Sequence, residues 1–385
     1  MKNTLVLVMV SFALAGCAIV DRIRGKDDEL EPLKPNPLPE IEAEVSLERQ
    51  WQFDIGDGQA GLRPALDGGT VFVASPGGRV AAVDVETGKG QWRADLDIDI
   101  SGGVGTGEGL VLLGGLNGEV VALDRRDGSE VWRAAVSSEV LAPPMATAGI
   151  VVVRTIDGGV TGLTTTSGER RWRLQRDEPS LTLRGSGPPL IDQNVAVLGF
   201  ADGQLAAVNV DNGAMLWEVS VARPSGTNEV ERMIDVDATP KLVGNALYAV
   251  AFQGSITAYA LGGNRTMWRR DISSYSDFAA DNDKIYLSDS LGRVHALDLA
   301  TGEEQWVQEQ LLRRRLSGPA VIRDYVVAGD YQGYLHVMAA GDGRLLGRRS
   351  FGDRISAQPL VRGDRILVLT EGGRLSAVAI TREGG

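Results

Sequence analysis

Short apolar runs separated by turn residues fill most of the chain. In residues 70–96, three such runs (TVFVAS, RVAAVD and GQWRADL) are rich in β-branched or other apolar side chains. Runs of this length and composition, bounded by Gly, Asp and Ser, predict short β-strands. No helical period follows residue 45. The pattern therefore predicts an all-β fold for the bulk of the chain.

A frame of glycine and tryptophan repeats through this β-rich region. Gly78 is followed ten residues later by Gly88 and fourteen residues later by Trp92, and the frame recurs with a unit of about 40 residues. The tryptophans in this frame are Trp92, Trp132, Trp172, Trp217, Trp268 and Trp306. Four short strands in a unit of this length are typical of the blades of a β-propeller.

The second glycine of the frame predicts a tight turn with positive φ, a backbone conformation that glycine adopts without steric cost. One unit has Asn264 at this place, and asparagine is the residue that tolerates the conformation next best. Another unit departs from the frame at Gly347, which stands where a tryptophan is expected.

The last unit predicts how the propeller closes. Its first glycine is Gly373, so its tryptophan would fall beyond the last residue, Gly385, whereas Trp51 has no glycine frame ahead of it. We expect residues near 47–54 to supply the missing outer strand, which closes the ring and removes two free sheet edges. The prediction is one eight-bladed β-propeller domain over residues 46–385, with four antiparallel strands in each blade.

The N-terminus carries an export signal. An apolar run over residues 5–14 follows Lys2 and ends near Cys17, the only cysteine in the chain. The run is too short for a stable transmembrane helix and is typical of a secretory signal peptide. Residues 14–17, LAGC, resemble the lipobox of bacterial lipoproteins, which implies that residues 1–16 are removed and that Cys17 is lipidated.

The residues that follow the lipobox indicate the location of the protein. Ala18 stands where inner-membrane lipoproteins of the enteric type have aspartate, which implies an outer-membrane anchor facing the periplasm. Residues 17–45 mix charges with several prolines, a composition that predicts a flexible tether. The formal net charge of −12 argues against nucleic acid as a partner and against a polybasic membrane contact, so we expect the lipid alone to hold the membrane.

The recurring phrase AxDxxTGxxxW, as in residues 296–306, resembles the tryptophan-docking repeat of the PQQ-type propeller superfamily. That superfamily includes periplasmic quinoprotein dehydrogenases, so a PQQ-dependent dehydrogenase is an alternative function. A tryptophan repeated six times at one offset is better explained by blade packing, because a ring has one centre and holds one cofactor. We therefore interpret the six framed tryptophans and Trp51 as blade-docking residues.

Other signs of catalysis are missing from the sequence. The single cysteine excludes the vicinal disulfide of quinoprotein dehydrogenases, and no acidic cluster has the spacing of a calcium loop. His295 and His336 each follow a repeat glycine by three residues, so they are equivalent strand positions in adjacent blades, and a metal pair is the alternative. We expect no enzymatic activity and no bound cofactor or metal.

The spacing breaks in two consecutive connections. Pro189 follows Trp172 by 17 positions and Pro240 follows Trp217 by 23, against about 12 in the other units. In a propeller these connections lead from the outer strand of one blade to the inner strand of the next, so they emerge side by side on one face. Long loops on a rigid scaffold are frequent binding sites.

The first long connection contains Leu181 and Leu183 beside Arg184, and the second contains Asp235 and Asp237. Exposed leucines next to an arginine form a small binding hot spot, and the aspartates either orient Arg184 or pair with a base of the partner. In the alternative interpretation the extra loop residues have no binding role and are merely tolerated on the surface, and the leucines fold back on the propeller.

A third connection carries Arg313, Arg314 and Arg315 in succession. A run of like charges is most often solvated on the surface, so we treat these three arginines as secondary candidates for partner binding.

The chain as a whole resembles the BamB family, lipoproteins of the outer-membrane β-barrel assembly machinery. The features that carry this resemblance are the lipobox, the acidic tether, the eight docking blades and the segments SLTLRG and DVDATP. The resemblance implies a non-enzymatic scaffold that binds the periplasmic POTRA domains of BamA, meets the other lipoproteins of the complex through BamA and aids insertion of barrel proteins. It also implies partner contacts at the five candidates in the two long connections. Direct contact with unfolded outer-membrane proteins is left open, and a generic peptide- or glycan-binding propeller is a further alternative.

Overall fold

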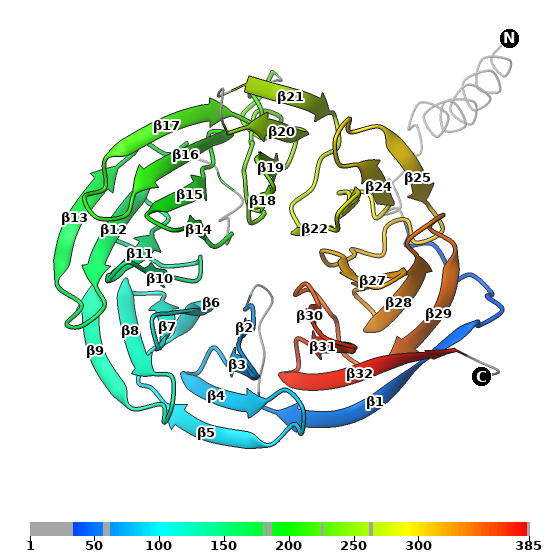
Figure 1. Cartoon of the computed structure of the whole chain (residues 1–385), viewed down its shortest axis with the longest axis horizontal. Coiled ribbons are helices and arrows are strands. Elements are labelled where there is room, and N and C mark those ends of the chain that lie inside the picture. The colour runs from blue at the N-terminus through cyan, green and yellow to red at the C-terminus, as the bar shows by residue number, and fades with distance from the viewer. Residues whose placement is uncertain are drawn as a thin grey trace, which may run out of the picture.

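The protein is an eight-bladed β-propeller (Figure 1). The computed structural model describes residues 34–56, 62–179, 182, 187–224, 227–261 and 265–382. Their strands form eight four-stranded antiparallel sheets around a central axis, which confirms the predicted fold. Within these ranges, no helix is long and apolar enough to cross a membrane.

The strands are grouped here by their distance from the axis. The innermost are β2 (Ala65–Asp67), β6 (Ile100–Gly107), β10 (Met145–Thr147), β14 (Leu190–Asp192), β18 (Lys241–Val243), β22 (Phe278–Ala280), β26 (Ala320–Ile322) and β30 (Leu360–Arg362). The second are β3 (Thr70–Ala74), β7 (Leu110–Gly115), β11 (Ile150–Arg154), β15 (Val195–Gly199), β19 (Ala246–Val250), β23 (Lys284–Ser288), β27 (Tyr325–Gly329) and β31 (Arg365–Leu369). The third are β4 (Arg79–Asp84), β8 (Glu119–Asp124), β12 (Gly159–Thr164), β16 (Gln204–Asn209), β20 (Ile256–Ala260), β24 (Val294–Asp298), β28 (Tyr334–Ala339) and β32 (Arg374–Arg382). The outermost are β5 (Gly90–Asp95), β9 (Glu130–Ala135), β13 (Arg170–Gln175), β17 (Met215–Ser220), β21 (Arg265–Arg270), β25 (Glu304–Gln308), β29 (Leu345–Ser350) and β1 (Val45–Asp54).

The hydrophobic core lies between the blades. All five residues of β3 are buried, because the two middle strands of a blade are covered by a neighbouring blade on each face. One core cluster accordingly joins residues of two adjacent blades, among them Phe72 and Val80 of the first and Val111 and Val121 of the second. Apolar side chains on both faces of the middle strands therefore hold the ring together.

The first and last strands of the chain close the ring, as predicted. β1 pairs antiparallel with β32, from Val45 opposite Arg382 to Asp54 opposite Arg374. Figure 1 shows this joint as the blue strand lying along the red one. The pairing leaves the last blade with the same four strands as the others.

The tryptophans of the frame pack on the turn glycines of the next blade. The ring of Trp132 covers Gly168, whose φ is +69°, and its Nε1 donates to the Thr165 carbonyl oxygen at 2.8 Å. Similar hydrogen bonds to the next blade's backbone are made by Trp51, Trp92, Trp172, Trp268 and Trp306. Trp217 is half-buried, and the turn residue expected beneath it, Asn264, lies outside the described residues.

At Gly347 the N-terminal strand takes the space that a tryptophan would fill. A Cβ atom added to this glycine would lie 2.3 Å from the Val45 carbonyl oxygen. The departure from the frame thus allows the backbone at the start of β1 to pack closely against β29.

The end of the expected tether is docked on the propeller, which corrects the prediction of a flexible segment up to residue 45. Asn36 N donates to the Leu312 carbonyl oxygen at 3.0 Å, and Arg348 Nη1 donates to the Pro39 carbonyl oxygen at 2.7 Å. Ile41 packs against a buried core cluster. We call residues 36–44 the strap. Arginines and apolar contacts of the propeller hold it, and composition alone does not reveal them.

We expect Gly168→Ala to destabilise the propeller by about 2 kcal/mol, because a side chain strains the positive φ and collides with a neighbour. The added Cβ would lie 2.6 Å from Cε3 of Trp132. Urea unfolding measures the effect. Gly149→Ala is the matched control, since Gly149 has a similar φ of +77° but nothing within 4 Å of the added atom. An equal loss in both variants would show that the tryptophan contact contributes nothing.

Candidate functional site

The described parts of the two long connections lie on one face of the propeller. We call it the connection face: the side on which the outermost strand of each blade leads to the innermost strand of the next. Residues 176–179, 182, 187–189, 221–224 and 227–240 belong to it. Because the four strands of a blade alternate in direction, the turns between second and third strands emerge on this face too. The connection face is therefore built from irregular chain on a rigid ring, an arrangement that favours binding.

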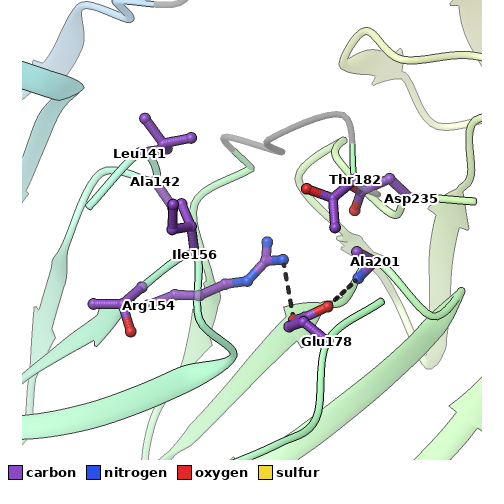
Figure 2. A pocket seen from close by; sticks show the side chains of 9 residues that line it. Leu141, Ala142, Arg154, Ile156, Glu178, Thr182, Ala201 and Asp235 are labelled. Atoms are coloured by element: carbon purple, nitrogen blue, oxygen red, sulfur yellow. Dashed lines mark hydrogen bonds and ion pairs between the residues drawn. The ribbon is translucent and has the colours of Figure 1, made fainter. Parts of the chain in front are cut away.

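The candidates of the first long connection, Leu181, Leu183 and Arg184, lie outside the described residues, so their partner contacts stay predictions. Thr182 between them is described, and it lies at the rim of a small pocket (Figure 2). The pocket has a volume of about 10 Å³, which is room for one water molecule. Its other lining residues are Leu141, Ala142, Arg154, Thr155, Ile156, Glu178, Ala201 and Asp235.

The candidates of the second connection, Asp235 and Asp237, are buried, with exposed fractions of 0% and 6%. The backbone of Asp235 forms a β-bridge to Phe252, and its carbonyl oxygen accepts a hydrogen bond from Phe252 N at 2.8 Å. Burial raises the pKa of Asp237 well above its usual range, and the nearby Asp235 raises it further. Both carboxyl groups therefore lie inside the propeller, and their two roles considered above stay predictions.

An arginine that the sequence analysis missed points into the same pocket. Arg154 is 8% exposed, and its Nη2 lies 3.8 Å from Glu178 Oε1 (Figure 2). Its Nε and Nη1 have no hydrogen-bond partner among the described residues. Burial raises the pKa of Glu178, although the charge of Arg154 opposes this effect. The pocket thus holds a buried cation whose hydrogen-bonding capacity is only partly used.

A second arginine, Arg176, shares an aromatic contact with Arg154. Phe200 is contacted by both guanidinium groups, which lie 5.3 Å (Arg154) and 4.4 Å (Arg176) from the ring centroid. Arg176 also pairs with Asp202 at 3.0 Å and with Glu218 at 2.5 Å. The sequence did contain a signal: Arg154 ends strand β11, where the corresponding strands β3, β15 and β27 end in alanine or glycine.

The arginine run is not solvated as a whole, which corrects the interpretation from composition. Arg314 is 2% exposed and lies 2.7 Å from Asp330 Oδ2, and it donates to the strap at the Asn36 carbonyl oxygen. Arg313 and Arg315 on either side of it are exposed. The middle arginine is therefore structural, and only its neighbours are accessible to a partner.

The two histidines occupy equivalent places in adjacent blades. His336 Nε2 lies 2.9 Å from Asp330 Oδ2, and His295 Nε2 lies 3.2 Å from Asp289 Oδ2. Both rings are buried, and each contacts the aspartate six residues before it. Across the described ranges, no three His, Cys, Asp or Glu residues are grouped so that they could hold a metal ion.

We expect Asp237→Asn to raise the melting temperature near neutral pH. The pKa of the carboxyl group is raised well above 3.8 in the folded chain, whereas the group ionises above 3.8 in the unfolded chain, so the folded state loses stability as pH rises from the unfolded pKa through the folded pKa. The advantage of the asparagine variant should therefore grow as pH rises above about 4 in differential scanning calorimetry. The exposed Asp97→Asn is the control. An equal change of melting temperature in both variants, or a change that does not depend on pH, would contradict the raised pKa of Asp237.

The fold is shared with enzymes. The quinohemoprotein alcohol dehydrogenase of Comamonas testosteroni matches with a TM-score of 0.68 at 14% identity, over 86% of this chain and 76% of that one. An identity this low shows a common propeller fold and nothing about activity.

A much closer similarity covers almost the whole chain. The family model described as outer membrane protein assembly factor BamB matches residues 45–98, 76–308 and 308–384. The protein of that name from Pseudomonas aeruginosa is 49% identical over 379 residues, which are 97% of this chain and 98% of that protein. The crystal structure of BamB from Moraxella catarrhalis matches with a TM-score of 0.81 at 26% identity, over 87% of this chain and 100% of that one. These matches confirm the resemblance found in the sequence, and the chain belongs to the family of the outer membrane protein assembly factor BamB.

Proposed function

We propose that this protein is a non-enzymatic scaffold in the assembly of outer-membrane β-barrel proteins. The observation that carries the proposal is the similarity to a protein named for this role at 49% identity over 97% of the chain. The scaffold binds the periplasmic POTRA domains of BamA and meets the other lipoproteins of the assembly complex through BamA. In this way it aids the insertion of barrel proteins.

The connection face is the surface proposed to bind BamA. The two long connections are adjacent on it, and one pocket is lined by Arg154, by Glu178 of the first connection and by Asp235 of the second. These three side chains face the pocket and position the loops, whereas Leu181, Leu183 and Arg184 contact the partner. Co-purification of BamA with the tagged chain from solubilised envelopes tests the proposal. Absence of BamA from the purified material would contradict the proposal.

The location follows from the lipid anchor. We propose that residues 1–16 are cleaved, that Cys17 carries the lipid, and that the propeller faces the periplasm from the outer membrane. Labelled palmitate incorporated into the wild type but not into Cys17→Ala would support this. We also expect the Cys17→Ala variant to be missing from the outer-membrane fraction.

The alternative of a PQQ-dependent dehydrogenase fits the central cavities poorly. Among the described residues that line them, the only carboxylate is that of Asp277, and it is already paired with Arg63. A calcium ion in such an enzyme needs six or more oxygen ligands. Titration of the purified chain with PQQ and Ca²⁺ is the direct test, and saturable tight binding with alcohol oxidation would overturn the scaffold assignment.

A further inference from the structure

A cavity of about 190 Å³ opens near the axis on the connection face. Residues from several blades line it, chiefly Arg63, Tyr275, Asp277, Arg315, Arg354 and Gln358. Three of these six side chains are arginines, although the whole chain carries a net charge of −12. The cavity is thus a local concentration of positive charge in an acidic protein.

A second cavity of about 240 Å³ adjoins the first and shares Arg63, Asp277 and Gln358 with it. Most of its remaining lining is apolar, including Pro64, Leu66, Val104, Pro143, Met145 and Leu360. The two cavities therefore form one site with a cationic part and an apolar part. A ligand that fits both parts carries an anionic group on an apolar body.

The arginines of the cationic part differ in how far their charge is already used. Arg63 is paired with Asp277, whose Oδ1 also accepts a hydrogen bond from Thr239 N at 2.7 Å. Arg354 is one-third exposed, and its Nε lies 3.3 Å from Glu371 Oε1. The side chain of Arg315 forms no ion pair or hydrogen bond that involves a described residue. Two guanidinium groups thus keep N–H donors for a ligand.

Tyr275 lines the same cavity as these two arginines. Its side chain is 39% exposed at the cavity rim, and its ring lies 6.4 Å from that of Phe252. Burial raises the pKa of its hydroxyl group, while the charges of Arg354 and Arg315 act on it in the opposite direction. The hydroxyl group is therefore close to both cations and stays protonated, so that it can donate a hydrogen bond.

The backbone around Arg315 is held in an unusual conformation. Arg313 and Arg315 have φ values of 61° and 47°, in the left-handed region that non-glycine residues seldom adopt. The buried ion pair of Arg314 with Asp330 lies between them and anchors this turn. Strain that the surrounding structure maintains is concentrated at functional sites. Here it directs Arg315 toward the cavity while Arg314 points inward.

We propose that this site binds a carboxylate carried on an apolar group. Arg315 and Arg354 hold the carboxylate, because a planar guanidinium group matches its two oxygens, and the Tyr275 hydroxyl donates to it. The apolar body of the ligand enters the adjoining cavity. The carboxylate is either the C-terminus of a peptide with apolar last residues or a free organic acid.

Binding of small probes to the purified mature chain in detergent tests this site by isothermal titration. N-acetyl-Leu-Phe with a free carboxylate should bind saturably, and its C-terminal amide at least about tenfold more weakly. Binding of 3-phenylpropionate as tight as that of the peptide would identify a free organic acid as sufficient, and weaker binding would identify a chain terminus. Equal binding of the amide, or no saturable binding of either acid, would overturn the proposal.

Variants of two neighbouring arginines provide the matched comparison. Arg315→Gln and Arg354→Gln should each weaken binding of the acid about tenfold. Arg313→Gln should leave binding unchanged, because Arg313 is exposed beside the cavity but does not line it. All three variants should melt near the wild-type temperature. If Arg313→Gln and Arg315→Gln lost equal binding affinity, the effect would come from the overall positive charge and not from a specific contact, which would overturn the proposed site. BamA is absent from this measurement, so its outcome is independent of the function proposed above.

Discussion

Leu181→Glu and Arg184→Ala are each expected to abolish co-purification of the chain with BamA while leaving the propeller folded. A buried leucine contributes about 1.5–3 kcal/mol to an interface, and a glutamate in its place must also be desolvated, so the combined loss exceeds about 3 kcal/mol. A loss of that size weakens binding more than a hundredfold, since each 1.4 kcal/mol is about tenfold. Recovery of BamA from solubilised envelopes, measured against a tag on the chain, gives the result.

The chain offers a matched control for each substitution. Leu216 on β17 is 48% exposed at the outer rim, so Leu216→Glu makes the same chemical change away from the connection face. Arg126 is 84% exposed in a turn on the opposite face, and Arg126→Ala is the control for Arg184→Ala. Normal recovery of BamA by the loop variants, or an equal loss with the controls, would contradict the interface assignment.

The second large effect is expected from Arg314→Met. This substitution keeps most of the apolar volume but leaves the buried Asp330 carboxylate without its arginine partner. Breaking a buried pair in this way costs about 3–5 kcal/mol. The strap also loses the hydrogen bond from Arg314 to Asn36. We expect a lower midpoint in urea unfolding and faster proteolysis within residues 36–44.

The pH dependence of this effect has a defined sign. Although burial opposes ionisation of Asp330, hydrogen bonds from His336, Tyr334 N and Arg314 lower its pKa below 3.8 in the folded chain. Its contribution to stability is therefore present above the unfolded pKa and is lost as pH falls through the folded pKa. The difference between wild type and Arg314→Met should shrink in acid. Arg313→Met is the control, and a midpoint as low in this exposed variant would contradict the role given to Arg314.

The buried charged groups of the connection face show what cannot be predicted from the sequence. Asp235 and Asp237 were identified because they lie in an unusually long connection, but only the folded structure shows that both are buried. Arg154 lies in the strand of another blade, far from that connection in sequence. The sheet of its own blade brings its guanidinium group to Glu178, which follows β13, and the next blades add Ala201 and Asp235 to the pocket. The chemistry of the pocket is therefore a property of blade packing.

The arginine run shows the same limit within three residues. Composition treats Arg313, Arg314 and Arg315 alike, whereas the backbone turns the middle one inward to Asp330 and the other two outward. The direction of a side chain in an irregular loop depends on local φ and ψ, which no periodic pattern reports. The strap was missed for a related reason, since its proline-rich composition is also that of a free linker.

The repeating architecture can be predicted from the sequence alone: the number of blades, the closure of β1 on β32 and the family. Each blade repeats one local solution, in which turn glycines, short apolar strands and a packing tryptophan recur at constant offsets, so the pattern is readable without distant contacts. Three features are visible only in the folded chain: which charged side chains are buried, the docking of residues 36–44, and the arginines from three blades that line one cavity at the axis. Those features depend on contacts between residues up to about 300 positions apart, and such contacts form only when the ring closes.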